Sequence, residues 1–153
     1  MESEYLKQAL EQAKLSVEQG GFPAGAVIVK DGEVIAEGIS IGFKLHDPTS
    51  HAETVAIRNA CKVLQTTNLE GCTLYASLQP CIMCFSGANW AGITKIVYGT
   101  HKTREMADKQ YYEGHNNIED INKNNTREIE LTFMPGIEEE SLALVEKWET
   151  RTQ

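Results

Sequence analysis

Four residues in two short motifs have the side chains and the spacing needed for metal chemistry. His51 and Glu53 stand two positions apart, and Cys81 and Cys84 stand three apart in the segment PCIMC. Residues three apart on a helix lie on one face, so the two thiolates can bind one ion together. With His51 as third ligand, the set leaves a fourth position for water, which is typical of catalytic zinc.

Glu53 is then available for proton transfer. Two thiolates and one neutral imidazole balance Zn²⁺, and the pKa of a water bound to such a metal falls towards neutrality. A carboxylate beside that water can take up its proton and deliver it to a leaving group. On a regular helix His51 and Glu53 point about 200° apart, so they converge only if His51 lies at the helix cap.

Two other interpretations of PCIMC remain open. A CxxC segment also fits a thioredoxin-like redox pair or a zinc-binding module without activity. Pro80 directly before the first thiol does not fit the redox pair, and the retained Glu53 has no purpose in a purely structural site. Cys61 and Cys72 lie among apolar residues, and we predict that both are buried free thiols.

The composition describes an ordinary globular chain with an acidic balance. Its 153 residues include 41% hydrophobic and 24% charged residues, which predicts a single domain over residues 1–153. The net charge of −8 argues against a nucleic-acid partner, because phosphate binding usually needs a basic excess. The first twenty residues contain no continuous apolar run, so we expect no membrane contact and a cytoplasmic location.

The elements that must position these motifs follow from apolar periodicity and turn signals. Helices are predicted over 2–18, 51–64, 81–93 and 137–149, and strands over 24–30, 33–41, 71–78, 95–100 and 127–133. Asp31-Gly32 joins the first two strands as a hairpin. Strands joined by helices favour parallel pairing, so we predict an α/β fold with a mixed sheet, with His51 and Cys81 at one sheet edge.

The polar stretch over residues 101–126 has no clear periodicity. A loop of this length inside a compact domain usually has a function of its own. We expect residues 101–114 to form part of a pocket wall, with Asp108 contacting an amino or ring N–H group of a substrate. A solvated surface loop fits the same pattern.

The combined motifs resemble those of a known superfamily. The segments FPAGAVIV, DPTSHAE and LYASLQPCIMC are similar to the cytidine deaminase-like zinc deaminases, whose signature is H-x-E followed by P-C-x-x-C. The similarity lies nearest the branch of bacterial guanine deaminases, tRNA adenosine deaminases and fungal cytosine deaminase, and it covers about residues 1–100.

The resemblance implies a fold and a set of roles. The fold is a three-layer α/β/α sandwich around a mixed five-stranded sheet, usually in a homodimer or larger assembly. His51, Cys81 and Cys84 would bind zinc, and Glu53 would carry the proton from water to the ring nitrogen and then to the departing ammonia. The backbone at Ala52 and Ser77 would contact the reacting edge of the substrate.

Two departures from the family pattern bear on the substrate. Ser40 stands where this branch commonly has asparagine, and Gln79 stands where many relatives have glutamate. Trp90-Ala91 and the acidic balance resemble guanine deaminases more than tRNA enzymes. We therefore expect hydrolytic deamination of a small-molecule nucleobase, with guanine favoured. Cytosine, a nucleoside, an adenosine in tRNA, or a non-catalytic zinc-binding role are the alternatives.

Overall fold

The computed structural model describes residues 2–151 and is built on one five-stranded sheet. The strand order is β2-β1-β3-β4-β5. β1 pairs antiparallel with both β2 and β3, whereas β3, β4 and β5 run parallel. The strands are β1 (Phe22–Lys30), β2 (Glu33–Ser40), β3 (Thr73–Ala76), β4 (Lys95–Tyr98) and β5 (Glu130–Phe133). The predicted mixed five-stranded sheet is confirmed.

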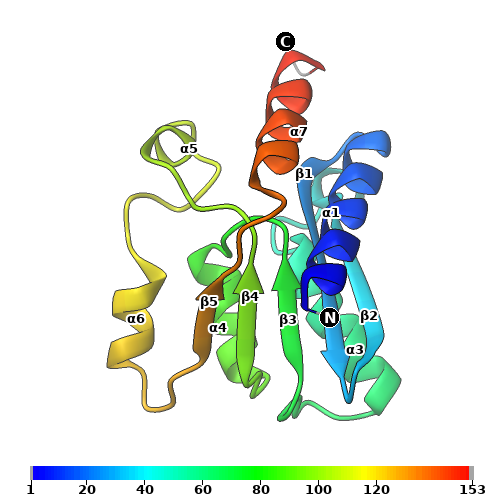
Figure 1. Ribbon diagram of the computed structural model, residues 1–153, viewed down its shortest axis with the longest axis vertical. Helices are drawn as coiled ribbons and strands as arrows, with labels where there is room; N and C mark the ends of the chain where they lie inside the picture. Colours follow the sequence, from blue (N-terminus) through cyan, green and yellow to red (C-terminus); the bar gives the residue numbers. More distant parts are fainter. Residues whose placement is uncertain (1, 152–153) are drawn as a thin grey trace.

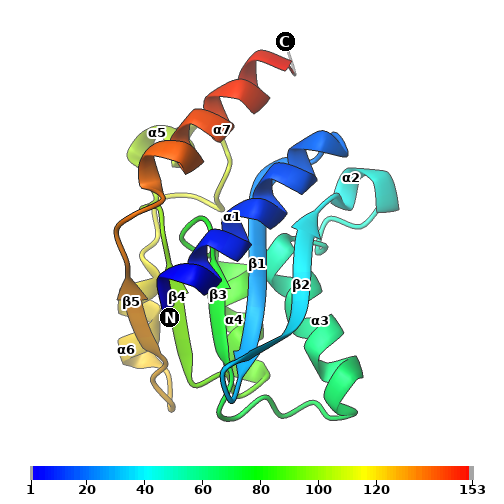
Figure 2. The same ribbon diagram turned by 45° about the vertical axis from the view of Figure 1, so that its right-hand side comes forward.

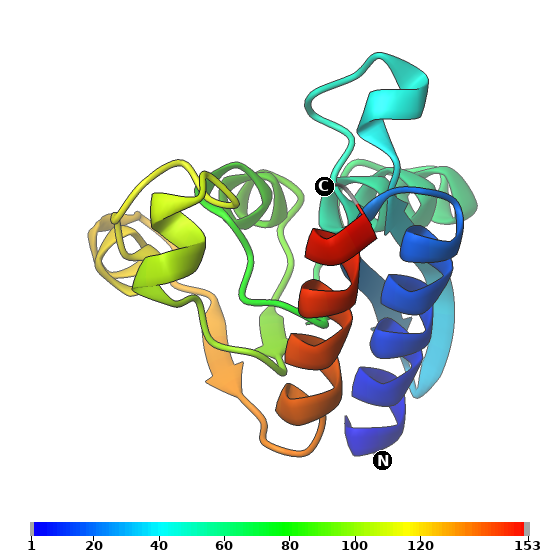
Figure 3. The same ribbon diagram turned by 90° about the horizontal axis from the view of Figure 1, so that it is seen from above.

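Helices cover both faces of this sheet (Figures 1 and 2). They are α1 (Glu2–Glu18), α2 (Gly42–Leu45), α3 (Ala52–Leu64), α4 (Ile82–Trp90), α5 (Arg104–Asp108), α6 (Ile118–Asn124) and α7 (Glu138–Arg151). Seen from above, α1 and α7 lie on one side of the sheet, and α3, α4 and α6 lie on the other (Figure 3). The expected α/β/α sandwich is therefore present.

Two apolar cores hold the layers together. Side chains of α1 such as Leu6 and Leu10 pack on Val27 and Val97 of the sheet, and all four are buried. The opposite core joins residues of α3 and α4, including Ala56 and the fully buried Phe85, to the other face of the sheet and to α6. Burial of this apolar surface is the main favourable term for the fold.

Glycine allows the first turn of α3 to lie directly on the sheet. A Cβ atom added at Gly38 of β2 would overlap the carbonyl oxygen of Ala52. Because Ala52 begins the helix that follows His51, this close approach fixes where the histidine and Glu53 lie. The hairpin turn is equally specific, since Asp31 and Gly32 both have positive φ, at 49° and 78°.

The stretch over residues 101–126 differs from the expectation. Instead of one long loop it contains the two short helices α5 and α6. Each has a side-chain cap: Thr103 accepts a hydrogen bond from the Met106 N–H, and Asn117 accepts one from the Glu119 N–H. Within residues 2–151 no helix is both long and apolar enough to cross a membrane.

Candidate metal and catalytic site

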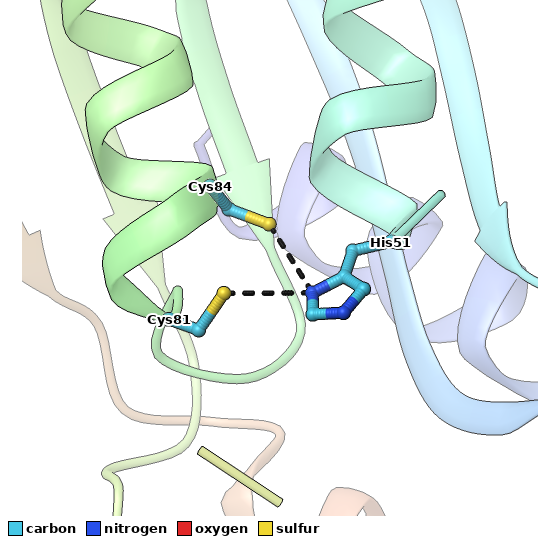
Figure 4. A group of neighbouring side chains, drawn as sticks. All are labelled: His51, Cys81 and Cys84. Carbon is cyan, nitrogen blue, oxygen red and sulfur yellow. Dashed lines mark hydrogen bonds between the residues drawn. The ribbon is translucent and has the colours of Figure 1, made fainter. Parts of the chain in front are cut away.

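Two helix N-termini meet at the site. His51 is the N-cap of α3, and Cys81 is the N-cap of α4, and both have extended backbone conformations. The His51 ring and the two thiols point towards one another between the starts of these helices (Figure 4). The partial positive charges of both helix ends favour thiolates here. The cap position of His51 also removes the 200° divergence from Glu53 that a regular helix would impose.

The donor atoms have the spacing of a metal-binding group. Nδ1 of His51 lies 3.4 Å from Sγ of Cys81 and 3.5 Å from Sγ of Cys84. Zinc bonds of about 2.3 Å to sulfur and 2.0 to 2.1 Å to nitrogen, at tetrahedral angles, put such atoms about 3.5 Å apart. The three ligand atoms all lie within 4.8 Å of one another. The residues present therefore fit a zinc ion.

The two thiols titrate as a pair. The hydrogen bond from Cys84, helped by His51, lowers the pKa of Cys81 to about 6 although burial acts in the opposite direction. The same bond to Cys81, together with burial, raises the pKa of Cys84. Two neighbouring thiolates repel each other, so the metal-free pair retains one proton. A dication removes that repulsion, which makes the pair suited to binding one.

Glu53 is held in the form of a buried acid beside these ligands. Only 6% of its surface is exposed, and burial together with the negative charge of Cys81 raises its pKa to about 7. A general base with a pKa near the working pH can both accept and return a proton. Glu53 therefore has the protonation behaviour that a proton shuttle needs.

The raised pKa makes the stability of the metal-free protein depend on pH. In the unfolded chain Glu53 ionises near pH 4.5, but in the folded protein it keeps its proton up to about pH 7. The free energy of unfolding is therefore not reduced by Glu53 below pH 4.5. It falls by roughly 1.4 kcal/mol per pH unit above that, until Glu53 ionises in the folded protein. We expect metal-free wild type to lose stability relative to Glu53→Gln across this window in denaturant titrations. A constant difference from pH 4.5 to pH 7 would contradict the assignment.

A cavity of about 900 Å³ opens beside the metal-binding group. Its lining includes His51, Glu53 and Cys81. Phe22 of β1 and Trp148 of α7 also contribute. Ala107 and residues 109–114 form one wall, whereas residues 101–106, which were also expected there, are not in the lining. The segment between α5 and α6 and the helix α7 thus form part of the wall of this cavity.

The other predicted site residues divide into two groups. Ser40 lines the cavity, and the Ser16 hydroxyl holds it in place by accepting from the Ser40 N–H at 3.0 Å. Among residues 2–151 the Ser40 hydroxyl has no hydrogen-bond partner of its own. Ala52, Ser77 and Asp108 are not in the cavity lining. The Ser77 hydroxyl accepts from the Gly25 N–H, and Asp108 pairs with His115 at 3.0 Å, so substrate contacts from these three stay predictions.

An aromatic cluster in the cavity wall was not predicted from the sequence. Phe22, Tyr111 and Trp148 meet edge to face, with ring centroids 5.0 to 5.5 Å apart. The Tyr111 hydroxyl donates to Glu149 at 2.5 Å, and Lys109 binds the same carboxylate at 2.8 Å. These contacts join α7 to the segment after α5. The three residues come from separate parts of the chain, so no local sequence pattern predicts that they form a cluster.

Comparisons with known proteins place this site in a family. The tRNA-specific adenosine deaminase of Aquifex aeolicus is 48% identical over 94 residues, which are 61% of this chain and 62% of that protein. The guanine deaminase of Bacillus subtilis is 47% identical over 100 residues, covering 65% and 64%. The matched region thus spans less than two thirds of the length of these relatives.

A solved structure of a tRNA:A34 deaminase superimposes with a TM-score of 0.77 at 31% identity, covering 93% of this chain and 99% of that one. The family model for the cytidine and deoxycytidylate deaminase zinc-binding region matches residues 1–100. That range contains His51, Cys81 and Cys84, which form the metal-binding group, and Glu53 beside them. The chain therefore belongs to the cytidine and deoxycytidylate deaminase family of zinc-dependent deaminases.

Proposed function

We propose that this protein removes the amino group of a free nucleobase by hydrolysis, and that guanine is its substrate. The observation that carries the proposal is the charge of the cavity beside Glu53. Lys109 is the one lysine or arginine in the described lining, and it is held between Glu105 and Glu149, at 2.8 Å from each. Such a wall suits a neutral heterocycle better than a phosphate chain.

The chain's own residues supply binding and proton transfer. His51, Cys81 and Cys84 would hold zinc, which supplies an activated water when bound. Glu53 accepts the proton of the attacking water and delivers protons to the ring nitrogen and to the leaving amino group. Water adds to the carbon that bears the amino group and ammonia leaves, so guanine would give xanthine.

The cavity also has the parts needed to orient a flat ring. The edges and faces of Phe22, Tyr111 and Trp148 offer aromatic surface. Ser40 offers a hydroxyl that is both donor and acceptor, but it is shorter than the asparagine usual at this position. We infer that this hydroxyl binds the edge of a purine ring through a bridging water, so that a longer asparagine amide could bind the same edge directly.

Deamination of adenosine in tRNA is the second candidate. The similarity to the Aquifex aeolicus enzyme favours it as strongly as the similarity to guanine deaminase favours guanine. A smaller cavity of about 320 Å³ adjoins the first through Gln79, and Lys102 and Arg104 lie in its lining. These two cationic side chains could bind the phosphates of a nucleic-acid strand.

An ammonia-release assay across substrates tests the proposal. The panel contains guanine, adenine, cytosine, isocytosine, the matching nucleosides and a tRNA anticodon stem-loop. We expect guanine to give the highest kcat/KM and the stem-loop little ammonia. Faster release from cytosine or from the stem-loop would replace guanine within the same zinc chemistry, and no release from any substrate would contradict deamination.

The variant Ser40→Asn tests the choice of guanine through the effect of a cavity side chain on kcat/KM. A buried polar group left without its partner costs about 1–3 kcal/mol, which is roughly 5- to 150-fold in kcat/KM. If guanine is the substrate, an asparagine amide at this position should retain or raise kcat/KM. A fall of more than about tenfold for guanine would contradict the proposal, and Ser86→Asn, outside the cavity lining, serves as the control.

We further propose that the protein acts as a homodimer. Trp90 is 89% exposed and Val63 is 60% exposed. They lie at the C-terminal ends of α4 and α3, which cover the same face of the sheet. Tryptophan is enriched at surfaces between protein subunits. Light scattering of the purified protein checks this proposal, since a monomeric mass would contradict it.

A further inference from the structure

The first turn of α4 carries both cysteine ligands, and its N-cap side chain leaves two backbone N–H groups of that turn without a local acceptor. A helix start leaves several backbone N–H groups without partners, and the side chain at the N-cap normally accepts one of them. Cys81 occupies the N-cap of α4, and its sulfur faces His51 and the backbone N–H of Cys84, so this side chain accepts from neither Ile82 nor Met83.

Glu113 meets this need from a distant part of the chain. Its Oε1 accepts the Ile82 N–H at 3.2 Å, and its Oε2 accepts the Met83 N–H at 3.0 Å. Both oxygens of one carboxylate are thus used by the first two residues of α4. A negative charge at a helix N-terminus is favourable in itself.

The residue before Glu113 binds the other side of the same motif. The Tyr112 hydroxyl donates to the backbone carbonyl of Gln79 at 2.6 Å. Tyr112 and Glu113 therefore hold the chain on both sides of Pro80-Cys81. Tyr112 is buried, and its side chain packs with Cys81 and Cys84. Through this pair the cavity wall after α5 is attached to the metal-binding turn.

We propose that Glu113 is a positioning residue for zinc, the remote cap that holds Cys81 and Cys84 in their ligating arrangement. It acts through the backbone N–H groups of Ile82 and Met83, and its carboxylate also lies next to the Cys81 thiol. This role concerns retention of the metal, and it does not depend on which base is deaminated.

The rate of zinc release to an excess of a colorimetric chelator tests the proposal. Loss of a residue that orients metal ligands commonly weakens binding 10- to 100-fold. We expect Glu113→Ala to release zinc roughly tenfold faster than wild type. Glu113→Gln should give a smaller increase, because its amide oxygen still accepts one N–H. Glu128 is exposed and is not in the cavity lining, so the control variant Glu128→Ala should release zinc at the wild-type rate.

A second variant tests whether Glu113 acts through the backbone. Ile82 is the first residue of α4, where proline is well tolerated, and the extended Cys81 is compatible with a following proline. Ile82→Pro removes one of the two N–H groups that Glu113 accepts. The increase in zinc release caused by Glu113→Ala should therefore be smaller in Ile82→Pro than in wild type.

Three results would overturn the proposal. One is wild-type zinc release in Glu113→Ala, and another is an equal effect of Glu113→Ala in wild type and in Ile82→Pro. The third is a raised KM for the best substrate with unchanged zinc release, which would make Glu113 a substrate contact. These outcomes are independent of the identity of the base, so a failure of the guanine proposal stays distinguishable.

Discussion

Glu53→Gln is expected to abolish turnover while leaving the zinc content and the fold intact. Proton transfer by a positioned side chain typically contributes about 10²–10⁴-fold to the rate, and Glu53 would serve more than one transfer in each cycle. Glutamine has nearly the same shape but cannot accept and return the proton. The measurement is kcat for ammonia release per bound zinc, with the best substrate of the panel.

Glu70→Gln is a matched control for this variant, since Glu70 is exposed and remote from the cavity lining. It should keep wild-type turnover. Glu53→Gln protein with zinc bound and more than about one tenth of wild-type kcat would mean that the proton travels through another group. Loss of zinc from Glu53→Gln would instead show that the carboxylate helps to hold the metal.

Cys81→Ser and Cys84→Ser are each expected to lose zinc and, with it, all measurable activity. A serine hydroxyl remains protonated near neutral pH, whereas zinc binds the thiolate form of cysteine. Removal of one ligand also leaves too few protein donors to retain the ion against a chelator. Metal analysis after dialysis against a chelator measures the loss.

The same change at Cys61 provides the control. Cys61 on α3 is half-buried and not buried as predicted, and its thiol belongs to no metal-binding group among the described residues. Cys61→Ser should keep one zinc per chain and wild-type turnover. Zinc retained by both Cys81→Ser and Cys84→Ser would exclude the ligand assignment, and a metal-free wild type with an oxidisable thiol pair would favour the redox interpretation.

Elements with strong local signals could be predicted from the sequence. The helix over residues 2–18 has the bounds of α1 because Leu6, Leu10 and Val17 recur at helical spacing. The Asp31-Gly32 turn and the long strands beside it were equally clear. α2, α5 and α6 were missed since helices of four, five and seven residues are too short to show a periodic apolar face.

The site was predictable only where its residues carry chemistry in a local motif. His51, Cys81 and Cys84 could be found because metal ligands need particular side chains at particular spacings. Glu113 and Trp148 could not, because their roles arise from contacts across 30 residues or more and their types are common on surfaces. Asp108 lies in the segment expected to line the cavity, but it pairs with His115 outside the lining, so its contact with a substrate stays a prediction.

We propose that deamination depends on a zinc ion held by His51, Cys81 and Cys84. The most direct measurement is ammonia release from guanine by one preparation in three states: as purified, after removal of metal by a chelator, and after addition of one equivalent of zinc. We predict turnover in the first state, none in the second and restored turnover in the third. Turnover that persists in the metal-free protein would show that deamination does not depend on zinc.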